Sequence, residues 1–187
     1  KAAKEVWQSK HNSHFPLDVF QTGSGTSSNM NANEVIANLA SKYGKTKIDP
    51  NDDVNMSQSS NDVIPTTIKV SAYKDLTKKL YPALDKLIST IDKKSSSLKG
   101  VVKTGRTHLM DAMPIDFSQE LSAWSSQLKV SKKTLSFLET RLLEMPLGGT
   151  AVGTGINAHP RFAKVFAKEL SKLSGGSFKV VPSENFF

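Results

Sequence analysis

The sequence contains no cysteine among its 187 residues, which excludes disulfide bonds and any metal site built from thiolates. Its four histidines are scattered along the chain, and no two of them have the spacing of a metal-ligand pair on one helix. We therefore expect the protein to bind no metal ion.

The sequence also lacks an apolar run long enough for a membrane-spanning helix, and we find no short cleavable apolar signal. These absences predict a soluble protein without a membrane partner. An intracellular location is expected.

The sequence has fewer acidic than basic residues: 17 aspartate and glutamate residues and 25 lysine and arginine residues, which give a formal net charge of +8. Such an excess can indicate a nucleic-acid surface. Here the lysines lie among acidic and hydroxyl residues in predicted helices, as on solvated faces, and aromatic residues do not interleave with them. We expect no nucleic-acid partner, although the charge is suited to attracting a dianionic substrate.

Strand-period runs, internal repeats and low-complexity tracts are missing as well, whereas helical periodicity is strong. One apolar stripe continues through a very long helix predicted over about 61–98, in which Pro65 fits the first turn and Pro82 predicts a kink. A second long helix is predicted over 117–145, because apolar residues at alternating steps of three and four indicate a coiled-coil-like seam. The seam residues are Leu121, Trp124, Leu128, Leu135, Leu138, Leu142 and Met145.

Two shorter helices are predicted over 29–43 and 160–174, from apolar residues at helical spacing and glycines just after their ends. The segment 45–58 is polar and rich in turn residues, which predicts a domain boundary. The fold class is therefore all-α: a long-helix bundle with elongated central helices and a small N-terminal helical domain.

Four segments are crowded with hydroxyl, amide and glycine groups: 22–31, 52–62, 103–111 and 147–157. Such groups hold a carboxylate by many short hydrogen bonds, and the free amides and dipole at a helix start add to the attraction. All four lie at or near the ends of predicted helices, and helix ends in a bundle can converge on one cleft. The segments therefore predict a site for a small anion.

Segment 103–111 also contains His108, whose side chain can take or give a proton near neutral pH. It lies beside a hydroxyl, a guanidinium and a carboxylate, those of Thr107, Arg106 and Asp111. Taken singly, each segment has a simpler interpretation: a hydrogen-bonded structural histidine, a flexible linker, a helix N-cap or a close packing turn. The four together favour a catalytic site.

The same segments resemble those of the class II fumarases in the fumarase/aspartase superfamily. The resemblance rests on four motifs in the same order and covers nearly the whole chain. They are GSGTSSNMNANEV at 23–35, NDDVNMSQSSND at 51–62, GRTH at 105–108 and GGTAVGTG at 148–155. Residues 59–61 and 147–160 resemble fumarase more closely than aspartase.

This resemblance implies a fumarate hydratase of the tricarboxylic acid cycle, which adds water reversibly to fumarate to give L-malate and uses no cofactor. It also implies a homotetramer in which each active site draws on three subunits. The implied location is the cytoplasm, or the mitochondrial matrix in a eukaryote. His108 would act in proton transfer. The residues that would bind the substrate carboxylates are Ser24, Gly25, Thr26, Ser59, Ser60, Asn61 and Thr107.

By the same resemblance, residues 1–56 would be part of the N-terminal lyase domain and residues 57–187 the first part of the central helical bundle. The family's mobile loop with its catalytic serine, and the lysine and asparagine after it, come later than Phe187. Residues 1–187 alone are therefore expected to be inactive. Two other interpretations stay open: an aspartate ammonia-lyase or another fumarate-releasing lyase of the superfamily, and a helical scaffold without activity.

One turn departs from the family pattern. The resemblance implies a secondary anion site there, and Asp49 stands where the family commonly has a histidine. Because a carboxylate repels a dicarboxylate, we expect no dicarboxylate at this turn. Its residues are Thr46, Asp49, Pro50, Asn51 and Asp52.

Overall fold

The computed structural model describes residues 1–20 and 25–181. The chain divides into two compact units: unit 1 comprises Lys1–Ser71 and Leu143–Phe187, and unit 2 comprises Ala72–Leu142. Helices dominate both units, which confirms the predicted fold class. The predicted family-domain boundary at residue 56 falls inside unit 1 and stays a prediction. None of the described helices is both long and apolar enough to cross a membrane.

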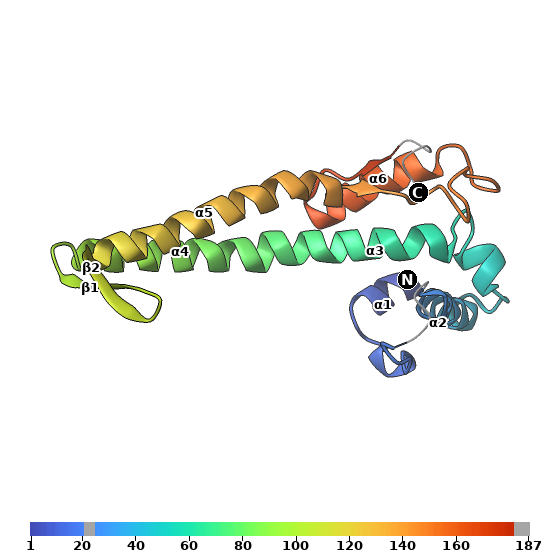
Figure 1. Cartoon of the computed structure of the whole chain (residues 1–187). Helices are drawn as coiled ribbons and strands as arrows, with labels where there is room; N and C mark the ends of the chain where they lie inside the picture. The colour runs from blue at the N-terminus through green and yellow to red at the C-terminus, as the bar shows by residue number, and fades with distance from the viewer. Residues whose placement is uncertain (21–24, 182–187) are drawn as a thin grey trace. The chain divides into compact units, whose positions relative to one another are not determined.

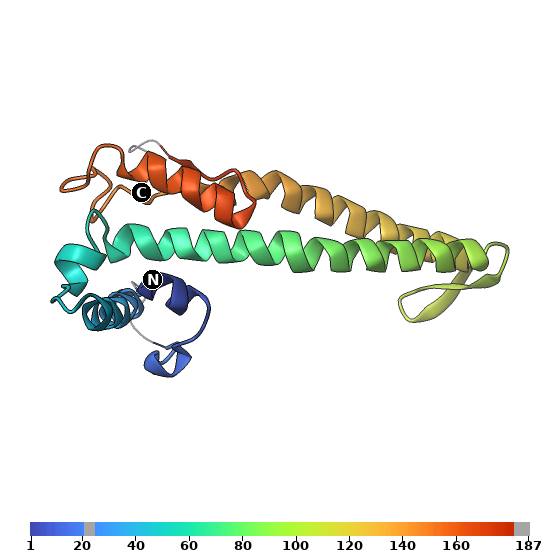
Figure 2. The same cartoon turned by 180° about the vertical axis from the view of Figure 1, so that it is seen from behind.

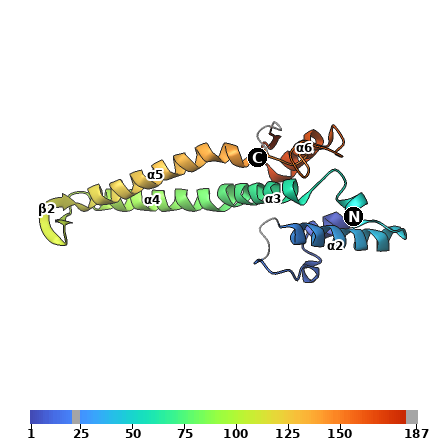
Figure 3. The ribbon, with the colours of Figure 1, turned by 45° about the vertical axis from the view of Figure 1, so that its right-hand side comes forward.

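Unit 2 is a long helical hairpin with a two-stranded ribbon at its turn, as Figures 1 and 2 show from opposite sides. Helices α4 and α5 pack side by side, and the strands β1 and β2 pair antiparallel. Figure 3 shows the ribbon where the two helices meet. The elements in chain order are the end of α3 (Ser60–Asp75), the π-helical turn η3 (Leu76–Leu80), α4 (Tyr81–Ser97), β1 (Val102–Thr107), β2 (Met110–Asp116) and α5 (Phe117–Leu142).

The helix predicted over 61–98 is present as α3, η3 and α4, which follow one another without a gap. The π-helical turn ends at Leu80, two residues before Pro82, where the sequence predicts a kink. Proline has no N–H and crowds the carbonyl one turn earlier, and a π-helical turn re-routes the hydrogen bonds around it. Pro65 lies in the second turn of α3 and not in the first, because α3 begins at Ser60.

Small polar side chains lie between α4 and α5. The Ser95 hydroxyl donates to the carbonyl of Ser118 at 2.9 Å, and Ser125 is almost fully buried. Of the predicted seam, the leucines at 121, 128, 135 and 142 are half-buried, whereas Trp124 and Leu138 are exposed. Helix α4 therefore covers only part of the seam.

The second long helix ends at Leu142, three residues before its predicted end, and Met145 lies in strand β3 (Glu144–Met145). The prediction was wrong here because Met145 precedes Pro146, and a proline disfavours helical backbone at the residue before it. The Met145 side chain is fully buried in unit 1, next to the buried Leu147 along the chain.

Strands β1 and β2 are also not predicted from the sequence. Every residue of the two strands is exposed or only half-buried. No core therefore imposes the alternation of apolar and polar residues by which a strand is recognised.

Unit 1 contains the two shorter predicted helices, α2 and α6, and a short parallel pairing of β3 with β4. Helix α2 begins three residues before the predicted start, and α6 begins two residues after it. The apolar core of unit 1 includes Val35, Ala37, Met145, Leu147 and Phe178. The remaining elements of the unit are α1 (Ala2–Trp7), η1 (Asn12–His14), α2 (Thr26–Gly44), η2 (Pro50–Val54), the start of α3, α6 (Phe162–Ser174) and β4 (Lys179–Val180).

Candidate functional site

The starts of α2 and α3 lie against each other in unit 1. Gly25, the N-cap of α2, has a φ of +64°, and a Cβ at this position would approach the Ile64 side chain to 3.0 Å. Thr26, the first residue of α2, is exposed, and Ser59–Asn61 stand at the start of α3. The structure thus brings these predicted carboxylate-binding residues into one region. Ser24 lies outside the described residues.

Asp62 joins the start of α3 to the glycine-rich loop after β3. Its side chain is 2% exposed. One carboxylate oxygen accepts the backbone N–H of Ser59 at 2.9 Å, and the other accepts those of Gly148 and Thr150 at 3.0 Å and 2.8 Å. A carboxylate that receives several backbone N–H groups is held in one orientation. Asp62 therefore fixes two of the predicted polar segments against each other.

A second bond connects the same two segments. The Asn61 side-chain amide donates to the carbonyl of Ala151 at 2.8 Å, and the Ser59 hydroxyl accepts the backbone N–H of Asn61 at 3.3 Å. The predicted residue Asn61 thus already uses one of its two N–H donors within the protein. Within the part of the chain that the structure describes, its other N–H and the Ser59 hydroxyl hydrogen have no acceptor and are available to a ligand.

A cluster of three asparagines lies beside Ser60. Asn29 and Asn33 of α2 lie against Asn55, and Asn29 donates to the Ser60 hydroxyl at 3.0 Å. Asn29 and Asn33 are both buried. Helix α2 therefore holds the Ser60 hydroxyl through Asn29.

Sequence reasoning missed Asp62 and the three asparagines as site residues. For Asp62 a signal was available: Ser59 and Asp62 have the spacing of a capping box, in which the acidic side chain returns to the N–H of the N-cap residue. For the asparagines no local signal exists, because they contact one another over 22 and 26 positions in the chain.

Thr107 and His108 lie in unit 2, at the tip of the β-ribbon. His108 and Leu109 form a two-residue loop with φ values of +51° and +62°, the backbone of a type I′ turn. This conformation costs non-glycine residues about 1–2 kcal/mol each. The side chain of Leu109 is 99% exposed, and His108 is exposed too. The turn therefore presents His108 on a narrow, projecting tip.

The ribbon beside His108 is shaped by Gly105. The strand register shifts between Thr104 and Arg106, and a Cβ on Gly105 would lie 2.7 Å from the carbonyl oxygen of Met113. Only glycine fits this β-bulge. Arg106 forms an ion pair with Asp111 across the ribbon, at 3.1 Å.

In the turn that contains Asp49, backbone N–H groups are hydrogen-bonded within the turn itself. The Asp49 carboxylate accepts the backbone N–H groups of Asn51 and Asp52 at 2.8 Å and 3.0 Å. The hydrogen bonds from the N–H groups of Asp52 and Asn51 lower the pKa of Asp49 below its usual value. Free amides at a helix start are the groups that an external anion would use. Asp49 occupies them, which supports the expectation that no dicarboxylate binds here.

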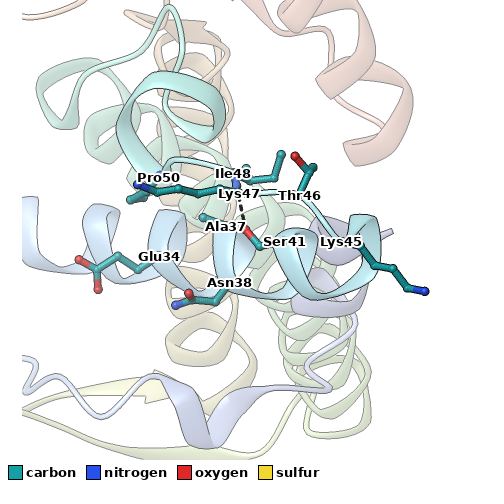
Figure 4. A pocket seen from close by; sticks show the side chains of 9 residues that line it. All are labelled: Glu34, Ala37, Asn38, Ser41, Lys45, Thr46, Lys47, Ile48 and Pro50. Carbon is teal, nitrogen blue, oxygen red and sulfur yellow. Dashed lines mark hydrogen bonds between the residues drawn. The ribbon is translucent and has the colours of Figure 1, made fainter.

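A groove of about 600 Å³ lies beside this turn. Figure 4 shows that the side chains of Lys45 and Lys47 point in different directions, away from each other. The Ser41 hydroxyl accepts the N–H of Ile48 at 2.9 Å. The groove therefore has no converging positive charges for an anion. Its lining residues are Glu34, Ala37, Asn38, Ser41, Lys45, Thr46, Lys47, Ile48 and Pro50.

The described residues contain no cluster of three or more His, Asp or Glu side chains suited to a metal ion. The predicted polar segments of unit 1 and the ribbon instead offer hydroxyls, amides, backbone N–H groups and the exposed His108. These groups can bind a carboxylate and transfer a proton.

The sequence pattern of the lyase family (Lyase_1) matches residues 1–186. The chain therefore belongs to this lyase family. A class II fumarate hydratase of Pseudomonas aeruginosa is 54% identical over 174 residues, which are 93% of this chain and 38% of that protein. A class II fumarate hydratase of Thermus thermophilus is 50% identical over 192 residues, covering all of this chain and 41% of that protein.

Solved structures agree with the sequence relatives. A crystal structure of a class II fumarase from Schistosoma mansoni superimposes with a TM-score of 0.88 at 38% identity, over 93% of this chain and 38% of that chain. These similarities confirm the resemblance to class II fumarases. The chain spans about two-fifths of the length of the relatives that it matches, from 38% to 41% in the two sequence relatives above.

Proposed function

We propose that the full-length protein containing this chain is a class II fumarate hydratase, which adds water reversibly to fumarate and forms L-malate. The observation that carries the proposal is the convergence of the starts of α2 and α3 with the loop 148–151 in unit 1. These segments are the ones in which the motif resemblance lies. The similarity to class II fumarate hydratases supports the same activity.

The substrate in this proposal is a small dicarboxylate. Hydroxyl, amide and backbone N–H groups surround its carboxylates and donate hydrogen bonds to them, and a charged acceptor roughly doubles the strength of each bond. The proposed carboxylate-binding residues are Ser24, Gly25, Thr26, Ser59, Ser60, Asn61 and Thr107.

His108 acts in proton transfer. In the direction from malate to fumarate, a proton leaves the carbon beta to the hydroxyl, and the electron pair of that C–H bond spreads into the neighbouring carboxylate. The C–O bond then breaks, and the departing hydroxide takes a proton to become water. Donors fixed around the carboxylate favour the transition state, because it carries more charge there than the ground state does.

We further propose a homotetramer whose active sites each take groups from three subunits, as the family resemblance implies. Light scattering of the purified full-length protein is expected to give four times the mass of one chain. A monomer with undiminished activity would contradict this assembly.

The activity is tested with the purified full-length protein and two substrates, L-malate and L-aspartate. Conversion of L-malate to fumarate is followed by the ultraviolet absorbance of the new double bond. We expect absorbance to rise with L-malate and not with L-aspartate. A rise with L-aspartate alone would identify an ammonia-lyase instead, and no reaction with either would favour a scaffold.

A further inference from the structure

Asn29 connects α2 to a predicted carboxylate-binding residue. It lies in the first turn of α2 and is 6% exposed. Its amide nitrogen is 3.0 Å from the Ser60 hydroxyl oxygen and 3.3 Å from the amide oxygen of Asn55. One turn later, Asn33 places its amide nitrogen 3.1 Å from the same Asn55 oxygen. Three chain segments thus share one partly buried polar cluster.

A main-chain carbonyl sets the direction of these hydrogen bonds. The carbonyl of Gln58 can only accept, and the amide nitrogen of Asn55 lies 3.4 Å from it. Asn55 therefore turns its amide oxygen toward α2, where it accepts from both Asn29 and Asn33. Asn29 must then present its NH₂ group, and the second hydrogen of that group points to Ser60.

The hydroxyl of Ser60 is consequently an acceptor on the side of α2. A hydroxyl has one hydrogen, and Asn29 leaves this hydrogen unused because an NH₂ group only donates. Within residues 1–20 and 25–181, no group accepts a hydrogen bond from it. Ser60 is half-buried, so its O–H remains available to a ligand.

We propose that Asn29 is a positioning residue, which holds the Ser60 oxygen so that its O–H is directed at a carboxylate of the dicarboxylic acid. This inference rests on the proposed function. A carboxylate only accepts hydrogen bonds, so a hydroxyl that is already set as a donor binds it without first having to reorient. Asn55 holds Asn29 in turn, and Asn33 holds the same oxygen of Asn55.

The test uses steady-state kinetics of the full-length protein with L-malate. Asn29→Leu removes the donor and keeps a similar side-chain volume. We expect KM to rise about tenfold, since a hydrogen bond to a charged group is weakened, with a smaller change in kcat. Asn38→Leu is the matched control on the exposed face of α2 and is expected to leave KM unchanged.

A double variant separates positioning from general structural damage. Ser60→Ala alone should raise KM by at least as much as Asn29→Leu. If Asn29 acts through Ser60, Asn29→Leu combined with Ser60→Ala should have the KM of Ser60→Ala alone. Thermal unfolding verifies that each variant is folded, and Asn29→Ala takes the place of Asn29→Leu if the latter does not fold.

The outcomes distinguish this inference from the function on which it rests. A wild-type protein without activity on L-malate overturns the proposed function and the inference with it. An active wild type overturns the inference alone in three cases: KM is unchanged in Asn29→Leu, KM is unchanged in Ser60→Ala, or the two increases multiply in the double variant.

Discussion

The backbone N–H of Thr150 donates to the buried carboxylate of Asp62 at 2.8 Å, although the two residues are 88 positions apart in the chain. Gly148 donates to the same carboxylate oxygen at 3.0 Å. These two bonds hold the glycine-rich loop against the start of α3, where Ser59–Asn61 lie. The geometry of the proposed carboxylate site therefore depends on a residue that is not itself proposed to touch the substrate.

Replacing Asp62 by asparagine is expected to loosen this loop. The neutral amide offers one oxygen in place of two, so in either orientation the N–H groups of Gly148 and Thr150 lose a charged acceptor, at a cost of about 1–3 kcal/mol. Amide hydrogen exchange of the peptide that contains residues 148–150, measured by mass spectrometry, should become about 5- to 150-fold faster. Asp75→Asn, at an exposed ion pair at the end of the same helix, is the control and should leave this peptide unchanged. Equal protection in Asp62→Asn would contradict the role assigned to Asp62.

Gly148→Ala is expected to lower stability through a steric clash. The added Cβ would lie 2.3 Å from the Cβ of Ala163 in α6, and φ at Gly148 is +104°. Overpacking costs about 1–3 kcal/mol and the positive φ about 1–2 kcal/mol. Thermal unfolding should therefore show a loss of about 2 kcal/mol or more. Gly175→Ala is the control that measures the cost of the positive φ alone, because φ there is +77° and nothing lies within 4 Å of the added Cβ. Its loss of unfolding free energy should be clearly smaller than that of Gly148→Ala.

The capping bonds of Asp49 predict a pH-dependent contribution to stability. The folded pKa of Asp49 is lowered from the ordinary value of 3.8 by the N–H groups of Asp52 and Asn51. A lowered folded pKa means that the contribution is fully present above pH 3.8 and is lost as the pH falls through the folded value. The difference in unfolding temperature between wild type and Asp49→Ala should thus be largest near neutral pH and should shrink as the pH falls below 3.8. A difference that grows on acidification would refute this assignment.

We also expect no dicarboxylate at the Asp49 turn. Its amides are occupied, and the carboxylate repels a second anion. Crystals soaked with L-malate should show no density for it beside Asn51 and Asp52. Asp49→Gly frees both amides and removes the charge, so this variant is the positive control. Malate beside an intact Asp49 would show that the prediction is wrong.

His108→Asn in the full-length protein is expected to reduce kcat by about 10²–10⁴-fold, the usual contribution of a proton-transfer residue. Stability should change little, because His108 is exposed and asparagine tolerates the positive φ of this turn. The matched control is His14→Asn, at an exposed histidine in η1, which should retain full turnover. An undiminished rate in His108→Asn would remove His108 from the mechanism.

The sequence by itself determined the helical class, the chemistry of the polar segments, and the approximate extents of α2, α5, α6 and the continuous helix formed by α3, η3 and α4. Helical periodicity repeats every three or four residues, so it can be recognised without knowledge of the rest of the fold. The resemblance to class II fumarases was also legible in short local motifs. The comparisons with known proteins confirm that resemblance, whereas the residue roles stay predictions.

Only the tertiary structure decided which polar groups meet. From the local sequence, Asp62 is recognisable only as part of a helix cap. Its second carboxylate oxygen, however, accepts the N–H groups of Gly148 and Thr150, which are 86 and 88 positions away in the chain. Asn29 and Asn55 look like ordinary helix-start and turn residues until the fold brings Asn29 into contact with both Asn55 and Ser60. The β-ribbon at His108 could not be predicted from the sequence either. An exposed pair of strands needs no alternation of apolar and polar residues, so its sequence carries no strand pattern. Hydrogen bonds between distant groups depend on the path of the chain, and no local pattern of residues encodes that path.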